Sequence, residues 1–400
     1  MRPMRLTILL ACLLAACAPA ATPPPAGTPT AAAATAERHA FVTLLGNDTI
    51  AVERITRTAN EVRAEVLLRA PRTTLHVYRM QLDAEGRPVT METTAHDPAA
   101  GPDSPPLSRE THRWGADSLR IESNGGQAPG AAAVAGGRDV LPFIDMVHWP
   151  FELMLSRAHA AAQDSIAIPL LTGRRTSPFV VRRVSAGDYT VTHPFRGTMT
   201  VQVDEQGRLE QLDAGRTTRA LLVRRVADVD LPSIARQFVA REAQRGPMGD
   251  LSGRGETTAT VGGANIVVDY GRPAKRGREI FGALVPWDRV WRTGANRATH
   301  FTTDRDLVLG GTPIPAGSYT LFSIPRADRW TLIVNRQTDI TGTAHDPEHD
   351  LARIEMQTRT LPEVVEDFTI RVDPEGSGGV LRLQWDRTEA YLPFQVTAGR

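Results

Sequence analysis

Arginine, aromatic and amide side chains between positions 270 and 300 form the part of the sequence best suited to hold a ligand. Arginine offers a planar fork that matches a carboxylate, phosphate or sulfate, asparagine both donates and accepts hydrogen bonds, and tryptophan provides a face for a cation or a sugar ring. The candidate ligand-binding residues are Tyr270, Arg272, Arg278, Trp291, Arg292, Asn296 and His300. This mixture predicts a site for a small polar or anionic ligand or a glycan.

The same residue types also have structural explanations. Trp291 would then be a core anchor, Asn296 a turn residue after Gly294, and Arg292 the partner of a buried acid. If the arginines converge in one concavity, ligand binding gains support. If they are scattered into separate salt bridges, a non-catalytic scaffold that binds through an exposed apolar patch is favoured instead.

Catalysis is a further alternative, although few enzyme motifs fit. A hydrolase or isomerase acting on a polar metabolite or glycan would use His300, Tyr270 or Asp269 as acid–base groups. The only lysine, Lys275, follows Ala274, so a P-loop is absent, and neither a G-x-S-x-G elbow nor a dinucleotide-binding glycine motif occurs. With 46 basic and 45 acidic residues, the net charge of +1 argues against nucleic acid as a partner.

A histidine- and acid-rich segment, 345–350, is the densest set of potential metal ligands. Two imidazoles spaced four apart on a helix can share a metal ion. However, Pro347 lies between His345 and His349, and no third histidine is near in sequence. We therefore expect a solvated loop or a first helical turn, with no metal and no other cofactor. A metal held by the two imidazoles and a carboxylate is the alternative.

The first seventeen residues indicate export and lipidation. A basic start precedes an apolar run, 6–16, that is typical of a secretory signal and too short for a permanent membrane span. The run ends in Leu14-Ala15-Ala16-Cys17, which resembles the bacterial lipoprotein box, where the cysteine is acylated with chains such as palmitate. We expect a signal peptide over 1–16, a lipidated Cys17 and a cell-envelope location, periplasmic or at the surface, with the membrane as partner. The alternative is an ordinary cleaved signal.

The two cysteines, Cys12 and Cys17, both lie in this leader. The folded part of a lipidated protein would therefore lack disulfides, cysteine nucleophiles and cysteine-bound metals. The alanine-, proline- and threonine-rich stretch 17–37 predicts a flexible tether.

Alternating apolar and polar residues predict an all-β protein in the main, with two β-rich domains. Residues 38–226 indicate an antiparallel meander with one covering helix between 139 and 162, in which Pro150 kinks or splits the helical segment. His148 adjoins aromatic residues there and is expected to be structural. The stretches 96–108 and 123–138 are expected to be loops.

A helical linker is predicted over 227–254, with a helix from Leu231 to Arg245 that ends at Gly246-Pro247. Strands without intervening long helices predict a β-sandwich or jelly-roll domain over 255–400.

Residues 257 to 396 resemble a bacterial family of exported proteins, domain-of-unknown-function family number 2911. The similarity rests on an ordered set of motifs: Tyr270-Gly271-Arg272-Pro273, Trp291-Arg292-Thr293-Gly294-Ala295-Asn296, Ile314-Pro315-Ala316-Gly317-Ser318-Tyr319 and Glu366-Asp367-Phe368-Thr369-Ile370. The resemblance implies a β-rich domain with no established activity. Arg297 stands where the family pattern is often acidic, so no role of a carboxylate carries over. The region 38–226 shows only a loose likeness to β-meander envelope lipoproteins.

Overall fold

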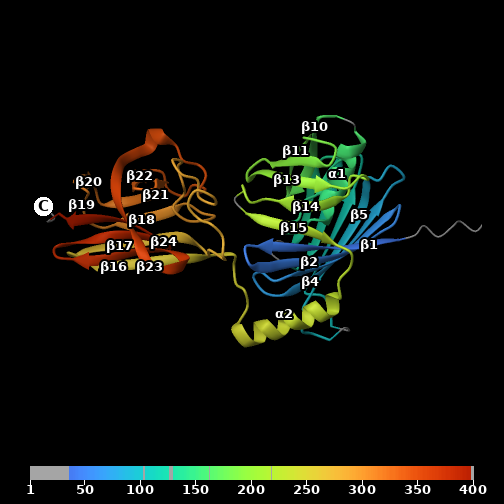
Figure 1. Ribbon diagram of the computed structural model, residues 1–400, viewed down its shortest axis with the longest axis horizontal. Coiled ribbons are helices and arrows are strands. Elements are labelled where there is room, and N and C mark those ends of the chain that lie inside the picture. Colours follow the sequence, from blue (N-terminus) through green and yellow to red (C-terminus); the bar gives the residue numbers. More distant parts are fainter. Residues whose placement is uncertain (1–35, 102–103, 126–128, 162, 218, 398–400) are drawn as a thin grey trace, which may run out of the picture. The chain divides into compact units, whose positions relative to one another are not determined.

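A computed structural model describes residues 36–397 apart from 102–103, 126–128, 162 and 218 (Figure 1). The predicted signal peptide, Cys17 and nearly all of the tether lie outside the described residues. None of the described helices is long and apolar enough to cross a membrane.

The first sheet has fifteen strands among the described residues. In chain order they are β1 (Glu37–Leu45), β2 (Asp48–Arg57), β3 (Glu61–Leu68), β4 (Thr74–Leu82), β5 (Pro88–His96), β6 (Ser108–Trp114), β7 (Ser118–Asn124), β8 (Gly130–Ala135), β9 (Leu141–Pro142), β10 (Ser165–Thr172), β11 (Arg175–Arg183), β12 (Asp188–His193), β13 (Gly197–Val203), β14 (Leu209–Asp213) and β15 (Leu221–Val226). Nearly all neighbours are consecutive antiparallel strands. The exceptions are β1, which also pairs with β15, and the parallel pair β9 and β10.

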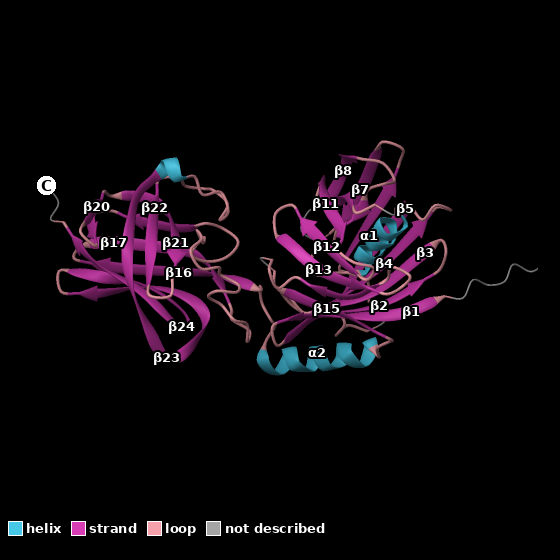
Figure 2. Cartoon of the chain, turned by 45° about the horizontal axis from the view of Figure 1, so that its top comes forward, coloured by secondary structure: helices cyan, strands magenta, loops and turns pink. Residues whose placement is uncertain are grey.

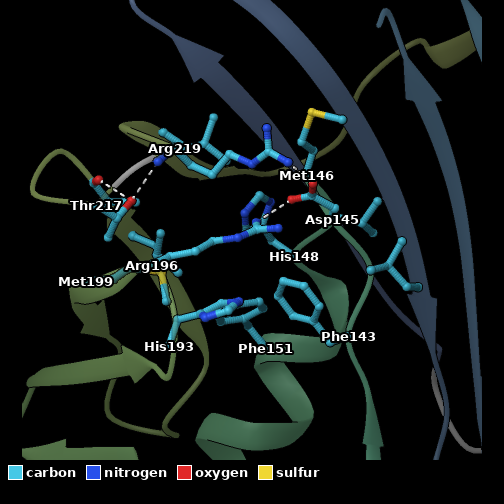
Figure 3. A pocket seen from close by; sticks show the side chains of 15 residues that line it. Phe143, Asp145, Met146, His148, Phe151, His193, Arg196, Met199, Thr217 and Arg219 are labelled. Carbon is cyan, nitrogen blue, oxygen red and sulfur yellow. Dashed lines mark hydrogen bonds and ion pairs between the residues drawn. The ribbon is translucent and has the colours of Figure 1, made fainter. Parts of the chain in front are cut away.

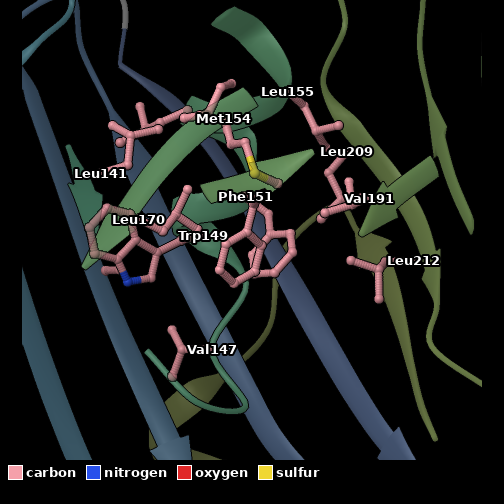
Figure 4. Close-up of a cluster of buried hydrophobic side chains, with 14 of the residues drawn as sticks. Leu141, Val147, Trp149, Phe151, Met154, Leu155, Leu170, Val191, Leu209 and Leu212 are labelled. Atoms are coloured by element: carbon pink, nitrogen blue, oxygen red, sulfur yellow. The ribbon is translucent and has the colours of Figure 1, made fainter. Parts of the chain in front are cut away.

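Helix α1 (Trp149–Ala160) packs inside the curve of this sheet (Figure 2). Trp149, Phe151 and Met154 are almost completely buried and lie among apolar residues of β9, β10, β12 and β14 (Figure 4). The same apolar cluster includes Phe41 and Val66 from the first half of the sheet. Burial of the helix supports the predicted covering helix. Only the second part of the segment 139–162 forms α1, and Pro150 stands in the first turn of that helix instead of bending it, because a residue there needs no N–H for an intrahelical hydrogen bond.

A carboxylate from a distant strand caps the start of α1. His148 at the N-cap makes no side-chain capping bond, but the backbone N–H groups of His148 and Trp149 donate to the two oxygens of Glu53, at 2.8 and 3.0 Å. Glu53 is fully buried on β2. Its negative charge therefore complements both the unpaired N–H groups and the helix dipole.

Helix α2 (Leu231–Arg245) has the predicted bounds. Asp230 accepts a hydrogen bond from the backbone N–H of Ser233, which satisfies one free donor of the first turn. Leu231 and Phe238 pack against Val52 and Leu67 on the opposite face of the sheet from α1.

Two turns with similar sequences, Asp83-Ala84-Glu85-Gly86-Arg87 and Asp204-Glu205-Gln206-Gly207-Arg208, have the same geometry. Asp83 and Asp204 each accept hydrogen bonds from the backbone N–H groups two and four residues later. Gly86 and Gly207 adopt φ of +73° and +74° in these turns. One loop prediction was wrong, because Gly130–Ala135 forms β8. Its alanines favour a strand only through pairing with β7, a tertiary contact that the sequence pattern does not reveal.

The second sheet has nine strands and no α-helix among the described residues. They are β16 (Ser252–Val261), β17 (Ala264–Pro273), β18 (Thr299–Thr303), β19 (Leu307–Leu309), β20 (Thr312–Ile314), β21 (Gly317–Pro325), β22 (Arg329–Asn335), β23 (Asp350–Glu375) and β24 (Gly378–Val396), with a 3₁₀ turn η1 (Pro347–His349).

The long strand β23 lets this sheet fold over itself. Its first part pairs with β22, and its last part pairs with β24 while Ile370 accepts a hydrogen bond from Thr257 of β16 at 2.6 Å. Trp330, Phe368 and Trp385 lie in the core between the two parts. The expected all-β fold with a sandwich-like C-terminal region is confirmed.

Candidate functional site

A cavity of about 320 Å³ collects four of the seven predicted ligand-binding residues. These four are Arg278, Trp291, Arg292 and Asn296. The other lining residues are Phe195, Arg196, Arg219, Ser252, Pro273, Leu284, Val285, Gly294, Ala295, Thr343 and Trp385. Four arginines contribute to the lining, and none of its described residues is acidic, so the cavity is strongly positive.

Arg278 lies in the loop between β17 and β18 and bonds only to backbone oxygens. Its guanidinium donates to the carbonyl groups of Ala274 and Lys275. No described carboxylate lies within ion-pair distance of it. Burial, reinforced by the positive charge of Arg276, lowers the pKa of Arg278 to about 10, against the opposing effect of Glu366. The group is therefore still charged at neutral pH.

Arg292 likewise bonds to a backbone oxygen and has no described carboxylate partner. Its Nη1 donates to the carbonyl oxygen of Asn296 at 3.3 Å, and the described residues offer it no carboxylate partner. Burial lowers the pKa of Arg292 below its ordinary value. Two partly buried cations in one cavity, neither neutralised, are an arrangement that an anion would stabilise.

The loop that carries Trp291, Arg292 and Asn296 is held in a strained conformation. Thr293, which is fully buried, has φ of +52°, and Asn296 has φ of +61°. A β-branched residue in this region is rare. The hydroxyl of Thr293 donates to Ser323 Oγ at 2.9 Å, and Thr299 Oγ1 donates to the carbonyl of Thr293 at 2.7 Å. These buried bonds hold the loop in place, and such strain often accompanies functional sites.

The loop also needs a glycine beneath it. A Cβ on Gly271 of β17 would lie 1.8 Å from the carbonyl oxygen of Ala295. In the structure the backbone N–H of Ala295 instead donates to the carbonyl of Gly271 at 3.2 Å. The loop is thereby fixed directly to the sheet.

Trp291 has two roles in this geometry. Its ring stacks on Trp385 with an interplanar angle of 14°. It also packs edge-on against Phe368, with the two ring centroids 5.0 Å apart, so it is a core anchor. It also lines the cavity together with Trp385. Both explanations of this residue therefore apply at once.

Three predicted site residues do not line the cavity. Tyr270 is buried, and its hydroxyl accepts a hydrogen bond from the backbone N–H of Ile370 at 3.1 Å. Arg272 lies 3.8 Å from Asp367 on the surface. His300 sits on β18 with its Nε2 buried and unpaired among the described residues.

The histidine- and acid-rich segment separates into two pairs. His345 Nε2 lies 2.9 Å from Asp350 Oδ1, and His349 Nδ1 lies 3.1 Å from Asp346 Oδ2. Asp350 also bonds to Asn335 of β22. Among the described residues no group of three or more histidine, cysteine or acidic side chains is placed to hold a metal ion.

Sequence reasoning missed several lining residues. Trp385 and Thr343 lie some 40 to 90 residues beyond the motif, and Arg196 and Arg219 come from the first sheet region. No local pattern marks them as neighbours of Arg278. They come together only in the folded chain, through contacts between segments that are far apart in the sequence.

Residues 252–394 match the model of a family described as a protein of unknown function, DUF2911. The matched region contains every cavity residue from Ser252 to Trp385 and agrees with the resemblance found in the sequence. No protein with curated annotation is significantly similar to the chain.

Proposed function

We propose that this protein is an envelope-anchored lipoprotein that binds a small anionic ligand at Arg278 and Arg292. The observation that carries the proposal is the pair of partly buried guanidinium groups whose only described partners are backbone carbonyls. A guanidinium in such a site still has free donors, and a carboxylate, phosphate or sulfate oxygen satisfies them while neutralising the charge.

The other cavity groups suit recognition of the rest of such a ligand. Asn296 and Thr343 supply polar side chains, whereas Leu284, Val285 and Trp291 supply apolar contact. This combination of a few polar groups with apolar walls is typical of small-molecule sites.

Binding is favoured over catalysis because the proposed acid–base residues are not in the cavity. Tyr270 is committed to the backbone of Ile370, and Asp269 forms an ion pair with Arg254 at 2.7 Å. His300 is also outside the lining. None of these three groups therefore lines the cavity that holds Arg278 and Arg292.

The proposal predicts that single arginine substitutions weaken anion binding without unfolding the protein. Isothermal titration of the purified protein with sulfate, phosphate and acetate measures affinity, and a ligand at 100 times its dissociation constant adds about 2.7 kcal/mol to the free energy of unfolding. We expect Arg278→Ala and Arg292→Ala each to weaken binding at least about tenfold, the effect of losing one charge-assisted contact of about 1.4 kcal/mol.

The matched control is Arg329→Ala, because Arg329 lies on β22, is 54% exposed and is paired with Glu355 outside the cavity. This control should bind anions as the unchanged protein does. Equal affinity in the two cavity variants and the control would contradict the proposal, as would the absence of saturable binding for every anion.

A further inference from the structure

Arg196 and Arg219 give the cavity a second pair of cations. Arg196 follows β12 and Arg219 precedes β15, and both line the cavity together with Arg278 and Arg292. Unlike the latter two, they share an acidic partner: Arg196 Nη1 lies 2.6 Å from Asp145 Oδ1, and Arg219 forms an ion pair with Asp145 Oδ2 (Figure 3).

Asp145 does not line the anion cavity itself. It lines a smaller neighbouring cavity of about 30 Å³ with Phe143, Met146 and His193, and Arg196 and Arg219 line both spaces. Arg196 and Arg219, the two ion-pair partners of Asp145, are thus shared by the two cavities. All three side chains are about one third exposed, which leaves them free to exchange partners.

The charges of Asp145, Arg196 and Arg219 do not balance. Asp145 supplies one negative charge to two guanidinium groups, so one positive charge remains. Burial would raise the pKa of Asp145, but the hydrogen bonds and charges of Arg196 and Arg219 outweigh it and hold that pKa below its ordinary value. Asp145 is therefore ionised at neutral pH and supplies a negative charge of the protein itself to Arg196 and Arg219.

We propose that the ligand carries two anionic groups, one bound by Arg278 and Arg292 and the other by Arg196 and Arg219, and that Asp145 competes with the second group. This inference rests on the proposed function of the same cavity. A volume of about 320 Å³ leaves room for a short body between the two groups, in contact with Trp291 and Leu284. A dicarboxylate is the simplest molecule of this class.

The test compares an anion that carries one carboxylate with anions that carry two. Isothermal titration with acetate, malonate, succinate and glutarate should show tighter binding of at least one dicarboxylate than of acetate. Asp145→Asn removes the competing charge, so dicarboxylate affinity should rise about fivefold, the scale of one partly exposed ion pair, while acetate affinity stays unchanged. Arg219→Gln should abolish the preference for dicarboxylates and leave acetate binding intact.

Asp373→Asn is the matched control, because Asp373 also lies between two arginines, Arg371 and Arg382, but outside the cavity. It should not change any affinity. If Asp145→Asn does not fold, Arg219→Gln alone decides whether the second pair of cations binds the ligand.

The outcomes separate the two proposals. If acetate and dicarboxylates bind equally and neither Asp145→Asn nor Arg219→Gln alters their ratio, this inference is overturned while the anion site stands. If no anion binds at all, both are overturned.

Discussion

At the scale of single residues, Arg278 and Arg292 stand out because each guanidinium group is charged and has no carboxylate partner among the described residues. Burying an unpaired cation is costly, and proteins usually offset that cost with a carboxylate, as Glu152 does for Arg225 at 2.6 Å. At Arg278 and Arg292 the described residues supply only carbonyl oxygens. Because no described carboxylate neutralises these two cations, we propose an anionic ligand for this cavity.

His193 gives a pH-dependent prediction at the same scale. Its Nδ1 accepts a hydrogen bond from the backbone N–H of Phe195 at 3.1 Å, so the ring is neutral. Burial, together with the charge of Arg196, lowers the pKa of His193 from 6.5 to about 4. The unfolded chain binds this proton below pH 6.5, whereas the native state resists it until about pH 4, so stability should fall over that interval as pH decreases.

Thermal unfolding at a series of pH values measures this effect. The unchanged protein should lose stability between about pH 6.5 and pH 4, and His193→Gln should reduce the loss. His76, whose pKa burial also lowers to about 4, contributes a remaining part. His349→Gln, at an exposed position, is the control. A pH profile that His193→Gln leaves unaltered would refute the assignment.

At the scale of elements, the loop from Trp291 to Asn296 depends on its contact with β17. Gly271→Ala should push the loop away, because its Cβ would lie 1.8 Å from the carbonyl oxygen of Ala295. We expect a loss of about 1–3 kcal/mol in the free energy of unfolding, as for other overpacked sites, and loss of anion binding.

Gly253→Ala is the control for this substitution. Gly253 lies opposite Arg272 on the neighbouring strand β16, and a Cβ there would meet nothing within 4 Å. Chemical denaturation and anion titration should leave this variant close to the unchanged protein. Equal effects of the two substitutions would show that the loop contact is not responsible.

The elements were more predictable than their contacts. Alternation of apolar residues located most of the strands, and Gly246-Pro247 marked the end of α2, because these signals depend on neighbours in sequence. The cap of α1 could not be predicted in this way, since Glu53 is 95 residues from His148. Likewise, the residue types between 270 and 300 pointed to Arg278 and Arg292, which line the cavity, but Tyr270 is buried in the core and Arg219 lies in the turn before β15.

At the scale of the whole molecule, we propose an anchored N-terminus joined to a β-rich body. The anchor is a proposal from Leu14-Ala15-Ala16-Cys17. We expect the protein to incorporate a labelled palmitate analogue and to fractionate with membranes, and Cys17→Ser to lose both properties because several acyl chains, at about 0.8 kcal/mol per buried methylene, supply the binding. Cys12→Ser is the control. Membrane recovery without label, or equal labelling of both variants, would contradict lipidation at Cys17.

The anion site itself is tested most directly by locating a bound anion. Crystals of the protein grown or soaked with selenate allow the selenium positions to be found from anomalous scattering. We expect a selenium peak within hydrogen-bonding reach of the guanidinium groups of both Arg278 and Arg292, and its loss in Arg292→Ala. Selenate found only at exposed arginines such as Arg329, with the cavity free of it, would contradict the assignment of this cavity to an anion.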